Sequence, residues 1–269
     1  MRILGKAALA ATAALAVTIG VLGGVASAGT GPRVYSPEQA GYAATGGQFK
    51  TVRTEVYLRQ PGQYAGEVSS YRLSVQLWSA RWVVSLGLFA STSPASAYRP
   101  VAAIYNRTTH ALVCSTATAA GKLCPGTPAN WADGSLTYPA GASVYLLATY
   151  TKTTGRMGFS VTDDMMTPPS SGFSYGIGTG ISFNQARVGA ELGTTPWSTG
   201  SYSPPKATMR LATFPAGYLT TYNNQTTGFQ SWWTHHKIIM TGTGGVTEVA
   251  PTDLSRGGYY FGVYLQPQS

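Results

Sequence analysis

Apolar and polar residues alternate along much of the chain that follows its N-terminal segment. In VRTEVYLR (52–59), Val, Thr, Val and Leu alternate with Arg, Glu, Tyr and Arg, and in YRLSVQLW (71–78) three aliphatic residues alternate with Arg72, Ser74, Gln76 and Trp78. Such a period of two is typical of a β-strand with one buried face. We therefore predict a half-buried strand at each of these two segments.

Many similar segments follow, separated by clusters of Gly, Pro, Ser and Thr, and helical periodicity is hard to find. Short strands punctuated by turns are typical of an all-β sandwich. We predict a two-sheet antiparallel β-sandwich of the jelly-roll type. The further predicted strands are 81–90, 100–106, 142–151, 156–163, 183–192, 207–214, 217–223, 231–240 and 259–266.

The N-terminal segment has the pattern of an export signal. Arg2 and Lys6 precede a long apolar run that ends in Ala26-Ser27-Ala28, the small-x-small pattern of a signal peptidase site. A membrane anchor is the alternative because the run approaches spanning length, but the cleavage pattern and the following turn residues favour a signal. We predict a signal peptide at 1–28 and a secreted, extracellular protein without a later membrane span.

The remainder, 29–269, shows no shift in composition that marks a boundary, and we predict a single domain. The Gly- and Pro-rich segment 194–205 is expected to be a surface loop within it.

In an exported protein the nearby pair Cys114 and Cys124 is expected to form a disulfide, which stabilises the fold by about 2–3 kcal/mol. A metal site would need more Cys or His nearby than His110, so we expect no metal and no cofactor.

The chain carries 18 basic and 9 acidic residues, and the basic ones are scattered singly. A phosphate backbone is usually bound by a run or stripe of basic residues, so we expect no nucleic acid partner. The 6 Trp and 17 Tyr residues suit sugar rings or a peptide strand, although any single Trp is more often part of a core. This aromatic content favours binding of an extracellular peptide or glycan in a groove.

Glu191 is an acidic residue within an apolar predicted strand, 183–192. Three apolar residues of NQARVGAELG face one way, which places Gln185, Arg187, Gly189 and Glu191 on the other face. We expect Glu191 to lie outside the core, near Arg187, with open space above the small Gly189. An ordinary exposed ion pair with an Arg, worth under about 1 kcal/mol, is the simplest interpretation.

Other groups are less well placed for catalysis. His235 and His236 alternate along a predicted strand and therefore point to opposite faces. Asp163 and Asp164 are adjacent and are expected to cap a turn, with a calcium site there as the alternative.

Several segments, in the same order along the chain, resemble the secreted glutamic peptidases (eqolisins) and their bacterial relatives, which have a concanavalin A-like fold. The resemblance covers about two thirds of the chain, from Gly41 to Tyr222. Its segments are GYAATGGQFKTVRTEVYL, RWVVSLG, AGASVYLLATYTKTTGRMGFSVTDD, NQARVGAELG and RLATFPAGYLTTYN.

The resemblance implies a catalytic pair. In this family a Glu activates water and protonates the leaving amine, while a Gln on a neighbouring strand of the concave face steadies the oxyanion. Glu191 matches the position of that Glu. Ser85, in WVVSLG, stands where the family has its Gln, and Gln76 on the face shared with Trp78 is the candidate to replace it.

Three functions are consistent with these patterns. The leading hypothesis is a glutamic-peptidase-like protein that binds an extracellular peptide or glycan in its concave groove. An acid hydrolase that uses Glu191 and Gln76 is the alternative, and a cell-surface structural protein is the third, since charge is sparse and Tyr, Thr and Gly are abundant. The residues expected to contact the polymer are Trp78, Arg187, Gln185 and Ser85.

Overall fold

The structure is a computed structural model that describes residues 33–36, 39–59, 70–91, 97–163, 170–192, 209–229, 234–241 and 247–265. The predicted signal at 1–28 and the predicted loop at 194–205 lie outside the described residues. Three of the six Trp residues also lie outside them, namely Trp197, Trp232 and Trp233.

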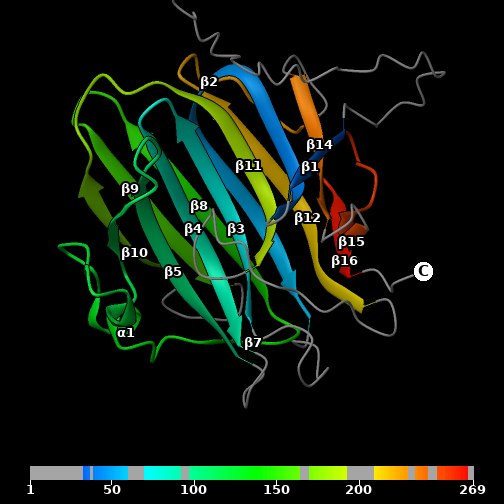
Figure 1. Ribbon diagram of the computed structural model, residues 1–269, viewed down its shortest axis with the longest axis horizontal. Helices are drawn as coiled ribbons and strands as arrows, with labels where there is room; N and C mark the ends of the chain where they lie inside the picture. Colours follow the sequence, from blue (N-terminus) through cyan, green and yellow to red (C-terminus); the bar gives the residue numbers. More distant parts are fainter. Residues whose placement is uncertain are drawn as a thin grey trace, which may run out of the picture.

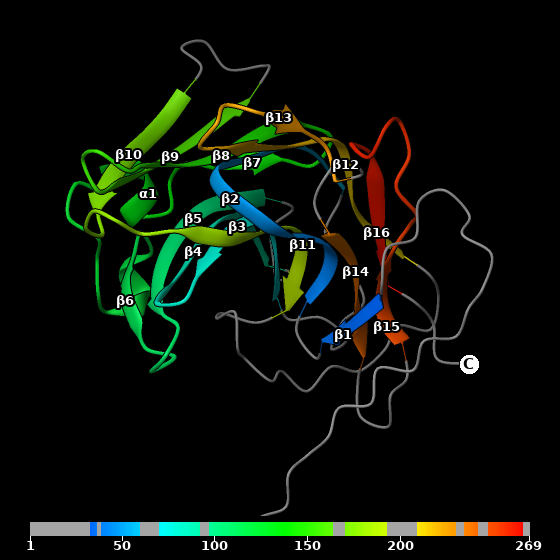
Figure 2. The ribbon, with the colours of Figure 1, turned by 90° about the horizontal axis from the view of Figure 1, so that it is seen from above.

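The described strands form two packed layers, which are joined through one long strand, β2 (Gln39–Leu58), and at one edge through pairing of β14 with β15 (Figures 1 and 2). The first part of β2 pairs with β11 and β14, and its second part pairs with β8 and β12. Gly46, at a φ of 82°, lies where the register between β2 and β11 shifts. This left-handed conformation suits glycine and allows the strand to pass from one layer to the other.

Each layer is a run of hydrogen-bonded strands. The first layer contains, in spatial order, β14 (Thr234–Thr241), the start of β2, β11 (Phe183–Leu192), β3 (Ser70–Ser79), β4 (Trp82–Ser91), β5 (Ala97–Asn106) and β6 (Leu112–Ser115). The second contains β10 (Ser170–Gly176), β9 (Arg156–Asp163), β8 (Ser143–Thr151), the end of β2, β12 (Met209–Thr221), β16 (Phe261–Leu265) and β15 (Thr247–Pro251).

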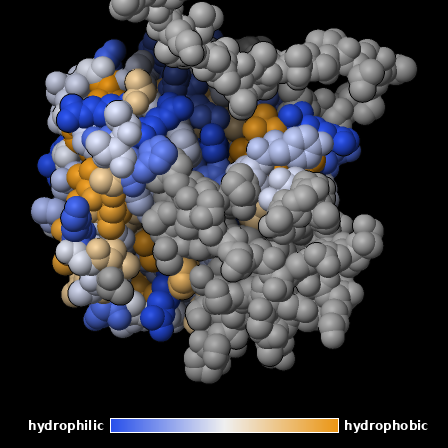
Figure 3. Space-filling model, in the orientation of Figure 1, coloured by the Kyte–Doolittle hydropathy of each residue, from blue (hydrophilic) through white to orange (hydrophobic). Residues whose placement is uncertain are grey.

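Short elements complete the described part. The strand β1 (Arg33–Ser36) pairs in parallel with β14, β7 (Tyr138–Pro139) pairs with β5, and β13 (Thr226–Thr227) pairs with β12. A 3-10 turn, η1 (Thr118–Ala120), and a short helix, α1 (Ala129–Ala132), lie beyond β6. In the space-filling view, hydrophobic residues gather between hydrophilic ones on the side where α1 and β10 lie (Figure 3).

The core fills the space between the two layers, and it consists of the alternate residues that the sequence pattern predicts. Leu73, Val75 and Leu77 of β3 are fully buried, as are Val144 and Leu146 of β8, and all five belong to one apolar cluster. Burial of each such side chain contributes about 1.5–3 kcal/mol. The fold is therefore the predicted all-β sandwich.

Each predicted strand overlaps a strand of the structure. The structure also contains strands that were not predicted, namely the first part of β2 and the short strands β1, β6, β7, β13 and β15. Two further differences concern β12 and β10. The segments 207–214 and 217–223 belong to one strand, β12, because a register shift between Thr213 and Ala216 carries the chain past Pro215 without ending the strand. The segment TPPSSG (167–172), one of the Gly-, Pro-, Ser- and Thr-rich clusters expected to separate strands, overlaps the start of β10, an edge strand that pairs only with β9 among the described residues.

The predicted disulfide is confirmed. Cys114 ends β6 and bonds to Cys124 beyond η1, with the two Cα atoms 4.9 Å apart. In the described part of the chain, no helix has the length and apolar character needed to cross a membrane.

Candidate functional site

The predicted site residues lie on the face of β11, β3, β4 and β5 that points away from the second layer, which we call the polar face. Residues directly opposite each other on antiparallel strands project to the same side of a sheet. Glu191 lies opposite Arg72, and Arg187 lies opposite Gln76. Gln76 in turn lies opposite Ser85 on β4. The polar face thus brings together Glu191, Gln76, Trp78, Arg187, Gln185 and Ser85.

Glu191 is held by donors on both of its carboxylate oxygens. Ser74 Oγ and Gln76 Nε2 each donate a hydrogen bond to Oε1. Arg72 Nη2 donates to Oε2 at 2.5 Å and forms an ion pair in which both side chains are 3% exposed. A buried pair of this kind is strongly destabilised when one partner is removed, because the other charge is left uncompensated.

Arg72 extends across the sheet at this point because β4 has a glycine beside it. A Cβ at Gly87 would lie 2.7 Å from Arg72 Cγ, so only glycine leaves room for the stem of the arginine. Burial alone lowers the pKa of Arg72, but the Glu191 carboxylate and Tyr105 outweigh it and raise the pKa above its ordinary value. Arg72 therefore remains a cation within the sheet.

Gln76 is fixed at both ends of its amide. Trp78 Nε1 donates to Gln76 Oε1 at 2.6 Å, which directs Nε2 toward Glu191. The Arg187 guanidinium lies 3.9 Å from the centre of the Trp78 ring, within cation–π distance. Arg187 also donates to the Oε1 atoms of Gln39 and, at 3.4 Å, Gln185. These contacts form one continuous polar network from Gln39 to Glu191.

Ser85 is buried like Gln76 and Trp78, which overturns the expectation that Ser85 and Trp78 are open to a bound polymer, and its Oγ has no hydrogen-bond partner among the described residues. The side chain faces Gln76 and Ala103 on the neighbouring strands. A buried hydroxyl without a partner is uncommon.

The expectation that Glu191 is open to solvent near Arg187 is wrong. The residue is 2% exposed, and its ionic partner is Arg72. The expected space above Gly189 is also absent, since a Cβ there would meet the backbone oxygen of Ala40 at 2.1 Å. The alternation pattern assigns a residue to a face but does not identify its neighbours on other strands, and these neighbours determine its burial.

Four residues in or beside the network were missed by sequence reasoning: Gln39, Arg72, Ser74 and Tyr105. The available signal was an arginine near the start of an alternating strand, in a chain with 9 acidic residues. A buried arginine requires a carboxylate partner, and Glu191 was already an acidic residue within an apolar strand.

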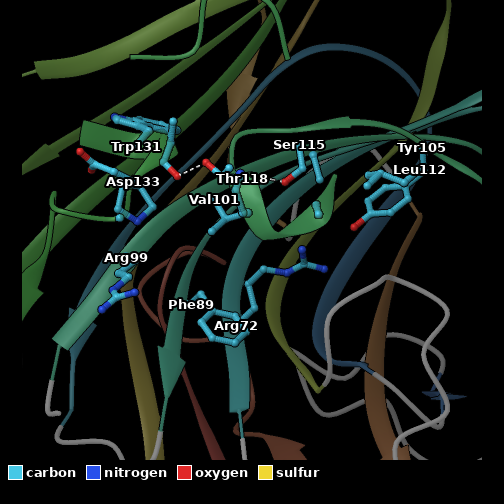
Figure 4. Close-up of a pocket in the computed structure, with 16 residues that line it drawn as sticks. Arg72, Phe89, Arg99, Val101, Tyr105, Leu112, Ser115, Thr118, Trp131 and Asp133 are labelled. Carbon is cyan, nitrogen blue, oxygen red and sulfur yellow. Dashed lines mark hydrogen bonds between the residues drawn. The ribbon is translucent and has the colours of Figure 1, made fainter. Parts of the chain in front are cut away.

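A cavity of about 850 Å³ lies beside this network (Figure 4). Residues of β4 and β5 form one side, with Arg72 at one end. Residues 115–134, which include the end of β6, η1 and α1, form the opposite side. Thr118 Oγ1 donates to the backbone oxygen of Ala132 at 2.5 Å, which joins η1 to α1.

Metal-ligating side chains do not gather in threes within the described residues. Asp163, considered above as half of a calcium site, is 4% exposed in β9, and Asp164 lies outside the described residues.

These layers have the fold of the glutamic peptidases. The structure is similar to scytalido-glutamic peptidase, solved with a transition state analog inhibitor, with a TM-score of 0.57 and 12% identity over 86% of this chain and 99% of the other. It is also similar to SCP-B, an eqolisin solved with the tripeptide Ala-Ile-His, with a TM-score of 0.54 and 11% identity over the same shares. At these identities the likeness establishes the fold and a remote resemblance. The sequence matches no family model and no curated protein.

Proposed function

We propose that this protein is secreted and binds an extended extracellular polymer, a peptide strand in first place, along the polar face without cleaving it. The peptidase fold supports a peptide ligand, and one protein of that fold has been solved with a tripeptide. The export signal predicted at 1–28 and the disulfide support an extracellular location.

The proposal rests mainly on one observation: both oxygens of the Glu191 carboxylate already accept hydrogen bonds from neighbouring side chains. A general base must reach a water molecule or the substrate and accept its proton. Glu191 instead accepts bonds from Ser74, Gln76 and Arg72 and is 2% exposed. This arrangement suits a residue that holds neighbouring strands and side chains in place.

The neighbouring groups suit recognition of a peptide. Arg187 and Gln185 are half-buried, so part of each side chain remains accessible to a ligand. Extended peptides are commonly bound by polar groups that contact the backbone and by pockets that receive alternate side chains. The 850 Å³ cavity beside Arg72 supplies such a pocket.

Binding is tested with the chain 29–269 and a fluorescein-labelled, denatured protein, followed by fluorescence anisotropy. We expect Arg187→Gln to weaken binding at least about tenfold, which corresponds to the loss of one charge-assisted hydrogen bond. Arg53→Gln is the matched control, because Arg53 is exposed on β2 and interacts with Tyr218, away from the polar face. Equal affinity of the two variants would contradict binding at this face, and retention on insoluble glycan alone would identify a glycan ligand.

An acid hydrolase that uses Glu191 and Gln76 is the second candidate. It is favoured by the hydrogen bond from the Gln76 amide to the Glu191 carboxylate, the pairing that a glutamic peptidase requires. This function requires Arg72 to release the carboxylate, and it predicts cleavage of denatured protein that is lost when Glu191 is replaced. The third hypothesis, a cell-surface structural protein, would be favoured if the wild-type chain self-associates and binds neither peptide nor glycan.

A further inference from the structure

The proposed function assigns the cavity beside Arg72 to a bound peptide but does not say which part of the peptide it receives. We propose that the cavity binds an apolar carboxylate, as presented by the C-terminal residue of a peptide with an aromatic or aliphatic side chain. The inference rests on the proposed function, because it names the part of a bound peptide that this end of the polar face receives.

The order of residues across the sheet gives the first argument. Glu191, Arg72, Phe89 and Arg99 lie directly opposite one another on β11, β3, β4 and β5. The half-buried Phe89 ring therefore lies between two arginines, and all three side chains line the cavity (Figure 4). An apolar surface flanked by two guanidinium groups matches a ligand with an apolar body and a negative charge.

The walls supply the apolar part of the site. Val101 and Leu112 are half-buried and Trp131 is buried, and all three line the cavity with several alanines. A volume of about 850 Å³ lies within the range of ordinary small-ligand sites. The space is therefore large enough for a terminal residue together with its neighbour.

The charges supply the polar part. Arg72 is 2% exposed, and its Nε has no hydrogen-bond partner among the described residues. A buried N–H group without a hydrogen-bond acceptor costs free energy, and a ligand that supplies an acceptor recovers it. Arg99 is exposed and adds a second cation near Gly134.

The only acidic residue that lines the cavity, among those described, is Asp133. Its Oδ1 accepts a bond from the Ser135 backbone at 2.8 Å within its own turn. Glu191, which pairs with Arg72, does not line the cavity. Glu191 neutralises the charge of Arg72 from outside the cavity, so the exposed cation of Arg99 and the unpartnered Nε–H of Arg72 are the groups that favour a carboxylate ligand.

The disulfide gives the cavity a fixed wall. Ser115, Ala117 and Thr118 lie within or beside the loop that Cys114 and Cys124 close, and all three line the cavity. A site with a rigid wall loses little conformational entropy when it binds a ligand. The cavity is consequently suited to select a ligand by its shape.

The test uses peptides of identical sequence that end in Phe, either as the free acid or as the C-terminal amide, in calorimetric titrations of the chain 29–269. We expect the free acid to bind at least about tenfold more tightly than the amide, because only the acid supplies an anion to the two arginines. N-acetyl-phenylalanine is expected to compete with the acid peptide. A long-chain fatty acid that binds while both peptides fail would overturn the peptide assignment.

Variants place the ligand in the cavity. Arg99→Gln is expected to reduce the preference for the free acid several-fold, whereas the surface variant Arg53→Gln is expected to preserve it. Two further variants fill the cavity with a Trp side chain, Val101→Trp from the sheet and Ala117→Trp from the opposite wall. Because the two positions lie on different elements, at least one variant is expected to fold, as judged by circular dichroism. The folded variant is expected to lose binding of the free-acid peptide. Equal binding of acid and amide, or binding unchanged in a folded filled variant, would overturn the inference.

The experiments distinguish failure of the inference about the cavity from failure of the proposed function. If the labelled denatured protein still binds, in a manner sensitive to Arg187→Gln, while acid and amide peptides do not differ, the inference about the cavity is overturned and the proposed function stands. If neither probe binds, both are overturned.

Discussion

Arg72 and Glu191 illustrate how two residues on neighbouring strands determine the chemistry of the polar face. Each is nearly fully buried, and the pair is completed by hydrogen bonds from Ser74 and Gln76 to the carboxylate. Ion pairs on a protein surface contribute little to stability, whereas breaking a buried pair is costly. Single and double replacements therefore have opposite expected effects.

The first prediction concerns stability. We expect Glu191→Gln to lower the free energy of unfolding by about 3–5 kcal/mol, because it leaves the Arg72 charge buried and unpaired. The double variant Arg72→Met with Glu191→Leu removes both charges and is expected to recover wild-type stability or exceed it. Urea denaturation of the three proteins measures this. Equal stability of Glu191→Gln and wild type would show that the pair is open to water.

The second prediction concerns the glycine beside Arg72. We expect Gly87→Ala to cost about 1–3 kcal/mol, because the new Cβ must displace the arginine stem from 2.7 Å or the Leu73 oxygen from 2.9 Å. Gly158→Ala is the matched control in β9, since its nearest atom would lie at 3.7 Å. Thermal unfolding compares the two. Equal loss in both would indicate a general effect of strand glycines instead of a specific contact.

The third prediction concerns pH. Burial, together with the nearby His235 and Arg187, lowers the pKa of His236 from its ordinary value of 6.5. As the pH falls, His236 of the unfolded chain therefore takes up a proton before His236 of the folded chain does. This uptake favours the unfolded state, so the stability due to neutral His236 is fully present above about pH 6.5 and declines as the pH falls below it. We expect His236→Asn to reduce the loss of melting temperature between pH 7 and pH 5. An unchanged difference would contradict the shift.

At the scale of elements, the loop closed by the disulfide defines one wall of the cavity. We expect the double variant Cys114→Ser with Cys124→Ser to lose about 2–3 kcal/mol of stability, because the unfolded chain gains the freedom of a short open loop. It is also expected to weaken the binding of the peptide that ends in Phe as a free acid. Denaturation and calorimetry measure the two effects, and retained affinity would show that the wall is rigid without the disulfide.

The alternation of residues predicted most strands because each layer has one face in the core. Leu73, Val75 and Leu77 illustrate this, since their spacing alone assigns them to the buried side. The short strands β6 and β15 were missed because they contain too few residues to show a period. The continuity of β12 was missed since Pro215 resembles a strand end, whereas its register shift accommodates the proline.

The candidate site was predicted only in part for a related reason. Sequence periodicity placed Gln76, Trp78 and Glu191 on polar faces of two strands, and the structure shows that these strands are neighbours. It gave no order of strands, so Arg72 was not recognised as the partner of Glu191. The order of strands depends on pairing between distant segments, which a local pattern does not contain.

At the scale of the whole molecule, the chain has the fold of the glutamic peptidases, but the Glu191 carboxylate on its polar face is paired with Arg72. A fold by itself does not establish an activity, which depends on the residues of the site. The central claim is that this protein binds a peptide strand and that Glu191 maintains the architecture of the face.

The most direct test is a search for cleavage products by mass spectrometry after long incubation of the chain 29–269 with denatured protein, from acid to neutral pH. The account predicts that no product accumulates above the level of the folded Arg72→Met, Glu191→Leu variant at any pH. Products that form with the wild type and are lost in that variant would contradict it and show that cleavage requires the Arg72–Glu191 pair.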